Sequence, residues 1–190
     1  MKTLLLTGFG AFPGAPDNPT QTIVTRLATH PLAGATLVTQ ILPVIWRDAD
    51  ARITQLIADT QPDAILHLGL ATQRKVISVE TRARNEATRL LPDADNICRT
   101  SGTIDPQGPG LRHARLDSAS IVNLLTARGL KAEASDDAGD YICNHTLYLS
   151  LGSDVPTVGF IHLPMPDEVM SLQAMTDGIA DVVQKLASEL

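Results

Sequence analysis

The stretch Ala64-Ile65-Leu66-His67-Leu68 decides the fold, because it is a short apolar run that ends at a glycine, Gly69. A run of this length beside a turn residue is typical of a strand buried on both faces of a sheet. Residues 3–7 and 157–162 have the same character. Since amphipathic stretches separate these runs, the sequence predicts a three-layer α/β/α domain with a twisted, largely parallel but mixed sheet.

The other elements follow from the same periodicities. A helix is predicted to begin at Asn18-Pro19, with asparagine as the N-cap and proline at the first helical position. Further helices are expected at about 48–58, 118–128 and 167–186, and further strands at 36–42, 76–80 and 130–134. Residues 86–112 hold many Pro, Gly and Asp residues and are interpreted as a long surface excursion with a functional reason.

Composition excludes several classes of protein. The 190 residues fit one domain, 1–190, and the formal net charge of −6 argues against binding of nucleic acid. No window approaches the roughly 18 apolar residues of a membrane span. The apolar run at 4–6 is short for a signal peptide, so a buried first strand is the better interpretation. We therefore expect a cytoplasmic protein that binds neither nucleic acid nor a membrane.

Neither a metal nor a cofactor is predicted. The two cysteines, Cys98 and Cys143, are expected to be free in a reducing compartment, and two thiols alone cannot form a structural zinc site. The glycine-rich loop at 7–14 lacks the spacings of the nucleotide-binding and phosphate-binding loops.

Cys143 is a candidate nucleophile. It follows the turn residues Gly139-Asp140, and the leucines after it indicate a helix that starts close to the thiol. The partial positive charge at a helix N-terminus can stabilise a thiolate. Judged from its neighbours alone, however, Cys143 fits a small buried apolar side chain better, because free cysteines are commonly buried.

His162 and Glu80 are candidates for a base and its orienting carboxylate, because each is at the end of a predicted strand. His67 has a comparable position, so placement alone does not choose between the two histidines. His145 follows Cys143 by two residues and would point to another face of the helix. A single strand-end glutamate is more commonly a solvated carboxylate.

Two of the three phenylalanines, Phe9 and Phe12, are in the glycine-rich loop. Aromatic side chains beside flexible glycines suit a flat, mostly apolar ligand, although simple core packing explains them equally well.

Taken together, these features resemble the pyroglutamyl peptidase I (pyrrolidone-carboxylate peptidase) family of cysteine peptidases over almost the whole chain. The resemblance rests on Gly8-Phe9-Gly10-Ala11-Phe12, Asn18-Pro19, Leu42-Pro43-Val44, His67-Leu68-Gly69, Glu80 with Ala83 and Asn85, residues 139–144, and Phe160-Ile161-His162-Leu163-Pro164. It implies a phosphorylase/hydrolase-like fold and a triad of Cys143, His162 and Glu80. It also implies peptides with an N-terminal pyroglutamate as substrates, a thioester intermediate, and a homo-oligomer, commonly a tetramer.

The same resemblance implies the residues around the substrate. Phe9 and Phe12 should enclose the pyrrolidone ring, and Asn18 should hold their loop. Further apolar wall is expected from Leu91, Tyr141 and Ile142. The sequence departs from the family pattern at the arginine linked to the oxyanion: Leu90 occupies its place, and Arg89, one position away, is the candidate instead.

Two other functions fit the sequence. One is a thiol amidase that keeps the triad and acts on another small cyclic or acyl group. The other is a non-catalytic binding module on the same scaffold, which the displaced arginine keeps open.

Overall fold

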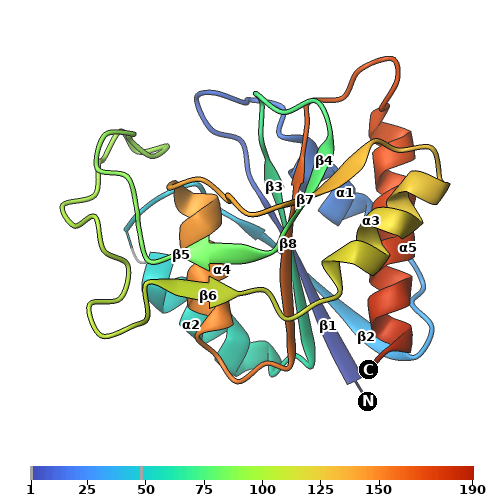
Figure 1. The fold of residues 1–190 in the computed structure, drawn as a ribbon, viewed down its shortest axis with the longest axis horizontal. Coiled ribbons are helices and arrows are strands. Elements are labelled where there is room, and N and C mark those ends of the chain that lie inside the picture. Colours follow the sequence, from blue (N-terminus) through green and yellow to red (C-terminus); the bar gives the residue numbers. More distant parts are fainter. Residues whose placement is uncertain (1, 48) are drawn as a thin grey trace.

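The computed structural model describes residues 2–47 and 49–190, and its centre is a six-stranded sheet (Figure 1). The strand order is β2-β1-β3-β8-β4-β7. These strands are β1 (Lys2–Phe9), β2 (Ala35–Leu42), β3 (Ala64–Leu70), β4 (Ile77–Glu80), β7 (Ala132–Ser135) and β8 (Thr157–Leu163). The helices are α1 (Pro19–Leu27), α2 (Ala49–Thr60), α3 (Ser118–Ala127), α4 (Ile142–Leu151) and α5 (Leu172–Ser188).

The sheet is mixed, as the sequence predicts. β1 pairs in parallel with β2 and β3, β3 with β8, and β4 with β7, whereas β4 and β8 are antiparallel. The central strand β8 therefore has one parallel and one antiparallel neighbour. His162 on β8 is paired with Gly69 on one side and with Ser78 on the other.

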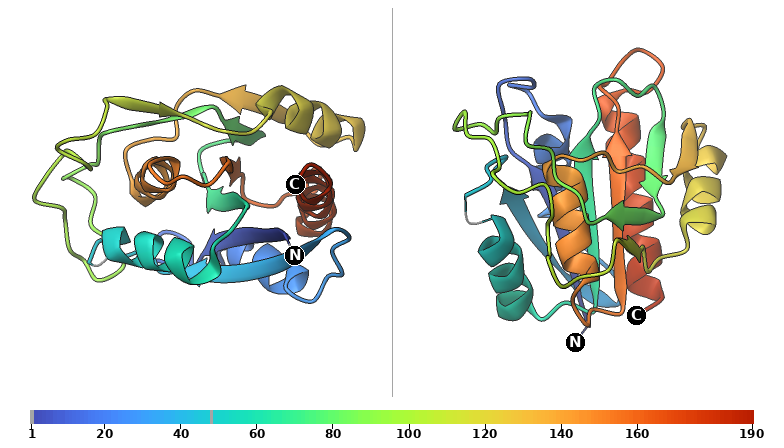
Figure 2. Two further views of the ribbon diagram at one scale, coloured as in Figure 1. Left: turned by 90° about the horizontal axis from the view of Figure 1, so that it is seen from below. Right: turned by 60° about the vertical axis from the view of Figure 1, so that its left-hand side comes forward.

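Helices cover both faces of the sheet (Figure 2). α1, α3 and α5 pack together on one face, and α2 and α4 pack on the other. Successive residues of a strand point to opposite faces, so Leu4 and Leu6 belong to one hydrophobic cluster and Leu5 to the second. Phe160 and Ile161 are divided between the two clusters in the same way. Burial on both faces explains why these strands are continuously apolar.

The helix boundaries follow their caps. Asn18 caps α1 by accepting a hydrogen bond from the backbone N–H of Thr20, and Pro19 is at the first helical position, as predicted. α5 begins at Leu172 rather than at 167, because Ser171 is its N-cap and accepts from the backbone N–H of Ala174. The predicted helix at 48–58 corresponds to α2, and residue 48 lies outside the described residues.

The excursion at 86–112 is irregular until it joins a small second sheet. There β5 (Arg82–Arg84) pairs antiparallel with β6 (Leu111–His113), and Figure 1 shows both strands beside α4. The buried Asn144 of α4 holds the start of the excursion: it accepts from the Arg84 backbone N–H and donates to the carbonyl groups of Arg84 and Glu86. Within the described part of the chain, no helix is long and apolar enough to cross a membrane.

Candidate active site

His162 and Glu80 form a buried hydrogen-bonded pair. The distance from His162 Nδ1 to Glu80 Oε1 is 2.7 Å, and the two residues are 4% and 0% exposed. The register explains the contact, because Glu80 is paired with Phe160 and His162 with Ser78. Glu80 and His162 are thus diagonal neighbours on the same face of the β4–β8 pair, within reach of long side chains.

The half-buried Cys143, the second residue of α4, reaches back to the same part of the sheet. A Cβ atom added to Gly69 would be 3.0 Å from Cys143 Sγ and 2.6 Å from the ring of Phe160. Because Gly69 is the register partner of His162 on β3, the sulfur lies above the strand next to the imidazole-bearing strand. The structure therefore brings the three predicted residues Cys143, His162 and Glu80 to one end of the sheet.

The surroundings of Cys143 favour the protonated thiol over the thiolate. Burial raises its pKa to about 12, the negative charge of Glu80 adds to this effect, and the positive charge of Arg74 opposes it. Desolvation of a charge thus opposes the stabilisation of a thiolate that the helix N-terminus offers. Attack by this sulfur requires a base to remove its proton.

Glu80 is ionised although it is buried. Burial alone would raise the pKa of its carboxyl group, but hydrogen bonds from His162 and Ser135 and the charges of His162 and Arg74 bring that pKa below its ordinary value. An ionised carboxylate on Nδ1 fixes the imidazole with its proton on that nitrogen, so that Nε2 is free to accept a proton.

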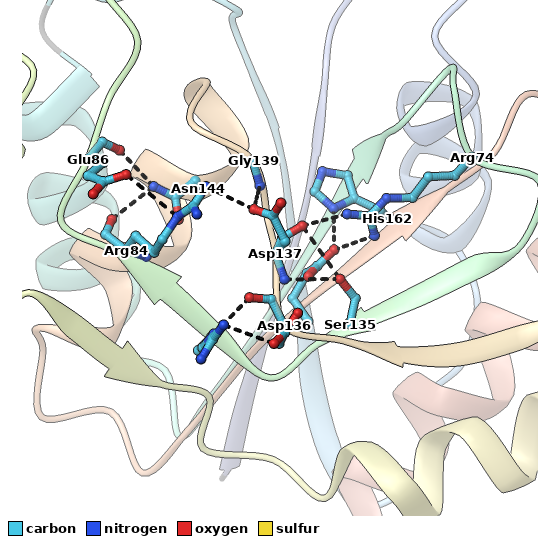
Figure 3. A network of polar contacts seen from close by, with 11 residues as sticks. Arg74, Arg84, Glu86, Ser135, Asp136, Asp137, Gly139, Asn144 and His162 are labelled. Atoms are coloured by element: carbon cyan, nitrogen blue, oxygen red, sulfur yellow. Dashed lines mark hydrogen bonds and ion pairs between the residues drawn. The ribbon is translucent and has the colours of Figure 1, made fainter.

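Arg74 is the residue that the sequence analysis missed. Its Nη1 is 2.7 Å from Glu80 Oε1, and its Nη2 donates to the carbonyl oxygen of Asp137 at 2.5 Å. Figure 3 shows the arginine beside His162, above the turn at 135–137. The signal in the sequence was its position: Arg74 is a cation shortly after β3, whose carboxyl end lies beside the carboxyl end of β8, where His162 is.

The other two buried histidines do not serve as the base. His67 lies between Thr7 Oγ1 at 2.6 Å and Ser150 Oγ at 2.9 Å, and burial lowers its pKa to about 3, so it stays neutral. His145 is bound toward α2, where its Nε2 is 2.6 Å from Asp50 Oδ1. His162 is therefore the strand-end histidine that pairs with a carboxylate.

An apolar cavity of about 350 Å³ is lined in part by Tyr141, which is two residues before Cys143 in the sequence. Its lining includes Phe12, Leu91 and Tyr141, three of the residues predicted for the substrate wall. The Tyr141 hydroxyl donates to the Pro92 carbonyl group at 2.9 Å, which joins the N-terminus of α4 to the excursion.

Phe9 and Ile142 are placed differently from the prediction. Both are buried in the core cluster between the sheet and α4, and both line a second, very small cavity rather than the one beside Phe12. Phe9 is the last residue of β1, and its ring packs 6.4 Å from that of Phe160. Because β1 extends to Phe9, strand alternation turns this ring inward, and the two phenylalanines do not enclose a common cavity in this structure.

Asn18 holds the loop as expected, since its Nδ2 donates to the carbonyl group of Gly10 at 3.1 Å. Arg89 is exposed on the excursion, with its side chain against Gly102, and no hydrogen bond or ion pair of Arg89 is found among the described residues. The neighbouring Arg82 and Arg84 are bound by Asp136 and Asp137.

No side chain caps the N-terminus of α4. Its N-cap residue is Tyr141, whose side chain makes no capping hydrogen bond, although the other described helix N-caps, Asn18, Asp117 and Ser171, all do. The first backbone N–H groups of a helix have no partner within it, so those around Cys143 can receive an anion.

Comparisons with known proteins show which family the chain is similar to. Residues 1–183 match a family model described as pyroglutamyl peptidase. A pyrrolidone-carboxylate peptidase of Mycobacterium marinum is 34% identical over 180 residues, covering 90% of this chain and 81% of its own. One from Pyrococcus furiosus is 32% identical, with coverage of 88% and 83%. The solved structure of a pyrrolidone carboxyl peptidase from Thermococcus litoralis superposes with a TM-score of 0.90 at 28% identity, covering 100% of this chain and 96% of that one.

Proposed function

Because this chain belongs to the pyroglutamyl peptidase family, we propose that Cys143, His162 and Glu80 are its catalytic triad. The protein is a cysteine peptidase that hydrolyses the bond after an N-terminal pyroglutamyl residue. The observation that supports the assignment best is the buried 2.7 Å contact between His162 Nδ1 and Glu80 Oε1, with Cys143 at the uncapped end of α4.

In the acylation step, Nε2 of His162 takes the proton of the Cys143 thiol as the sulfur attacks the carbonyl carbon that joins the pyroglutamyl residue to the next one. The S–C bond forms and the carbonyl electron pair moves onto oxygen. When this tetrahedral intermediate collapses, the C–N bond breaks and His162 gives its proton to the leaving amine. In the second step His162 takes a proton from a water molecule as the water attacks the thioester carbonyl carbon. The S–C bond then breaks, His162 returns the proton to the sulfur, and pyroglutamate is released.

The oxyanion of each tetrahedral intermediate needs positioned hydrogen-bond donors. We assign this role to the backbone N–H groups at the start of α4, including that of Cys143, because no side chain occupies that helix end. In this proposal Arg89 does not contact the oxyanion, since it is exposed on the excursion with its side chain near Gly102.

The lactam ring is expected to bind in the cavity that Phe12, Leu91 and Tyr141 line. Apolar walls suit the uncharged ring, whereas free glutamate would place a charged amine and a carboxylate there without partners, at a large desolvation cost. Phe9 and Ile142 support this wall from the core, and Asn18 holds the Phe12 loop.

Hydrolysis of pyroglutamyl-aminomethylcoumarin by the purified chain tests the function. The parent should release coumarin, and Cys143→Ala should abolish release while leaving the circular dichroism spectrum unchanged. A panel of coumarin amides with other small acyl groups distinguishes a pyroglutamyl peptidase from a broader thiol amidase. A folded parent that cleaves none of several pyroglutamyl substrates would refute the proposal.

We also propose that residues 1–190 form one catalytic domain, which acts in the cytoplasm as a homo-oligomer. The two free cysteines, Cys98 and Cys143, suit a reducing compartment. Exposed apolar side chains such as Leu90, at 87%, and Val169, at 69%, are suited to a contact between copies. Light scattering of the eluted protein measures the number of copies.

A further inference from the structure

We propose that Arg74 is a positioning residue of the active site, which holds the Glu80 carboxylate against His162 and ties both to the loop that leads to Cys143. The inference rests on the proposed triad and adds a fourth member, which does not touch the substrate.

The geometry of Arg74 joins three parts of the chain. The residue is in the turn after β3, where its backbone N–H donates to the carbonyl group of Ala71 at 3.0 Å. One end of its guanidinium group is 2.7 Å from Glu80 Oε1 at the end of β4. The other end donates to the carbonyl group of Asp137, in the loop between β7 and α4. A single planar group thus fixes the triad carboxylate relative to the segment that leads to the nucleophile.

The shared oxygen gives this contact a chemical consequence. His162 Nδ1 and Arg74 Nη1 both donate to Glu80 Oε1, so the carboxylate divides its charge between two donors. Glu80 thus orients the imidazole ring of His162 while the guanidinium group of Arg74 takes up part of the charge on the same oxygen.

The charge of Arg74 also acts on the nucleophile. Glu80 is fully buried on the same end of the sheet as Cys143, and its negative charge disfavours a thiolate there. Arg74, whose side chain is 25% exposed, is the cation that offsets this charge. The Arg74–Glu80 pair is neutral as a unit, and it lets a carboxylate orient the base without opposing ionisation of the sulfur.

A purely structural role for Arg74 makes different predictions, and Arg82 supplies the matched control. Arg82 also binds the 135–137 turn, because its Nε donates to the Asp136 carbonyl group at 2.7 Å and its Nη2 to the Asp136 carboxylate at 2.9 Å. It has no contact with Glu80 or His162 among the described residues. Loss of either arginine loosens the turn, but only loss of Arg74 removes a charge from the triad.

The experiment uses alkylation by iodoacetamide, which reports ionisation of the thiol and needs no substrate. A Cys98→Ser background removes the exposed second thiol. The second-order rate of Cys143 alkylation is measured from pH 6 to 10 in this background and with Arg74→Gln, Arg74→Lys or Arg82→Gln added. The value of kcat/KM for pyroglutamyl-aminomethylcoumarin is measured on the same preparations.

We expect Arg74→Gln to lower the alkylation rate at pH 8 by about tenfold, as loss of one neighbouring cation raises the thiol pKa. Its kcat/KM should fall by at least the same factor, whereas Arg82→Gln should stay within about twofold of the background on both measures. Arg74→Lys keeps the charge and should keep the alkylation profile, but it loses the Asp137 contact and part of kcat/KM.

An Arg74→Gln protein that is alkylated at the background rate across this pH range overturns the proposal. If that variant does not fold, Arg74→Lys decides instead. Lysine keeps the positive charge, so an alkylation profile that is displaced by as much as one pH unit in Arg74→Lys also overturns the proposal. A background protein that alkylates normally but cleaves no pyroglutamyl substrate refutes the proposed function, and the alkylation series still tests the role of Arg74.

Discussion

The sulfur of Cys143 occupies the space that a side chain at Gly69 would require. An added Cβ would meet Sγ at 3.0 Å and the ring of Phe160 at 2.6 Å. Gly69, which follows the apolar run at 64–68, is thus also required by the active site. It allows the helix that carries the nucleophile to approach the sheet beside His162.

We therefore expect Gly69→Ala to impair both activity and folding. The methyl group must displace the Phe160 ring or the sulfur, and such overpacking should lower the free energy of unfolding by about 1–3 kcal/mol. Urea titration and coumarin release measure the two effects. Gly110→Ala is the matched control, because nothing lies within 4 Å of its added Cβ, and it should behave as the parent does. Normal turnover by Gly69→Ala would contradict this account of the site.

Glu80→Gln should retain the fold and lose most of its turnover. The amide cannot carry the charge that stabilises the imidazolium, and its NH₂ group can bind the wrong tautomer of His162. A loss of about 10³–10⁴ in kcat is expected from the behaviour of comparable triads. Steady-state kinetics measure the loss. Asp136→Asn, a change to an exposed carboxylate in the adjacent turn, should have little effect on kcat.

His67 makes the protein sensitive to acid. Its pKa is about 3 when folded, because burial disfavours the charged ring, and about 6.5 when unfolded. Between these values the unfolded chain binds one more proton than the folded chain, so the free energy of unfolding falls by about 1.4 kcal/mol per pH unit as pH decreases. His67→Gln should remove this contribution to the slope, measured by urea titration from pH 4 to 7. His113→Gln, at an exposed position, should not change it.

Phe9, at the end of β1, and Phe12, in the loop after it, should respond differently to truncation. Phe12 lines the 350 Å³ cavity, so Phe12→Ala should raise KM for the pyroglutamyl substrate with a smaller change in the free energy of unfolding. Phe9 is 3% exposed, and Phe9→Ala should destabilise the fold by about 3–5 kcal/mol through the void that it leaves. Titration with urea and measurement of KM separate the two effects. An unchanged KM in Phe12→Ala would show that the lactam ring of the substrate does not bind in this cavity.

Much of the secondary structure could be predicted from periodicity. The buried strands and the Asn18 cap carry local signals, since apolar runs and cap residues act over a few positions. The end of a strand is a weaker signal. The sequence predicts a first strand that ends at Thr7, whereas β1 extends to Phe9. Because Phe9 was assigned to a loop, the alternation of side chains along the strand could not be used to predict that its ring faces the core.

The site was harder to predict than the fold, because its contacts join residues that are far apart in the sequence. Glu80 and His162 are 82 positions apart, and they meet because the antiparallel register of β4 and β8 makes them diagonal neighbours. No local pattern states that direction, and the resemblance to a family supplied the pairing. Arg74 was missed because an arginine in a polar turn looks like any solvated cation until its partner is known.

The position of β8 in the sheet makes the whole site depend on one strand. β8 joins β2-β1-β3 to β4-β7, and it also carries His162. A chain cut before residue 157 therefore loses both the link between the two parts of the sheet and the proposed base for Cys143, and we expect it to be inactive.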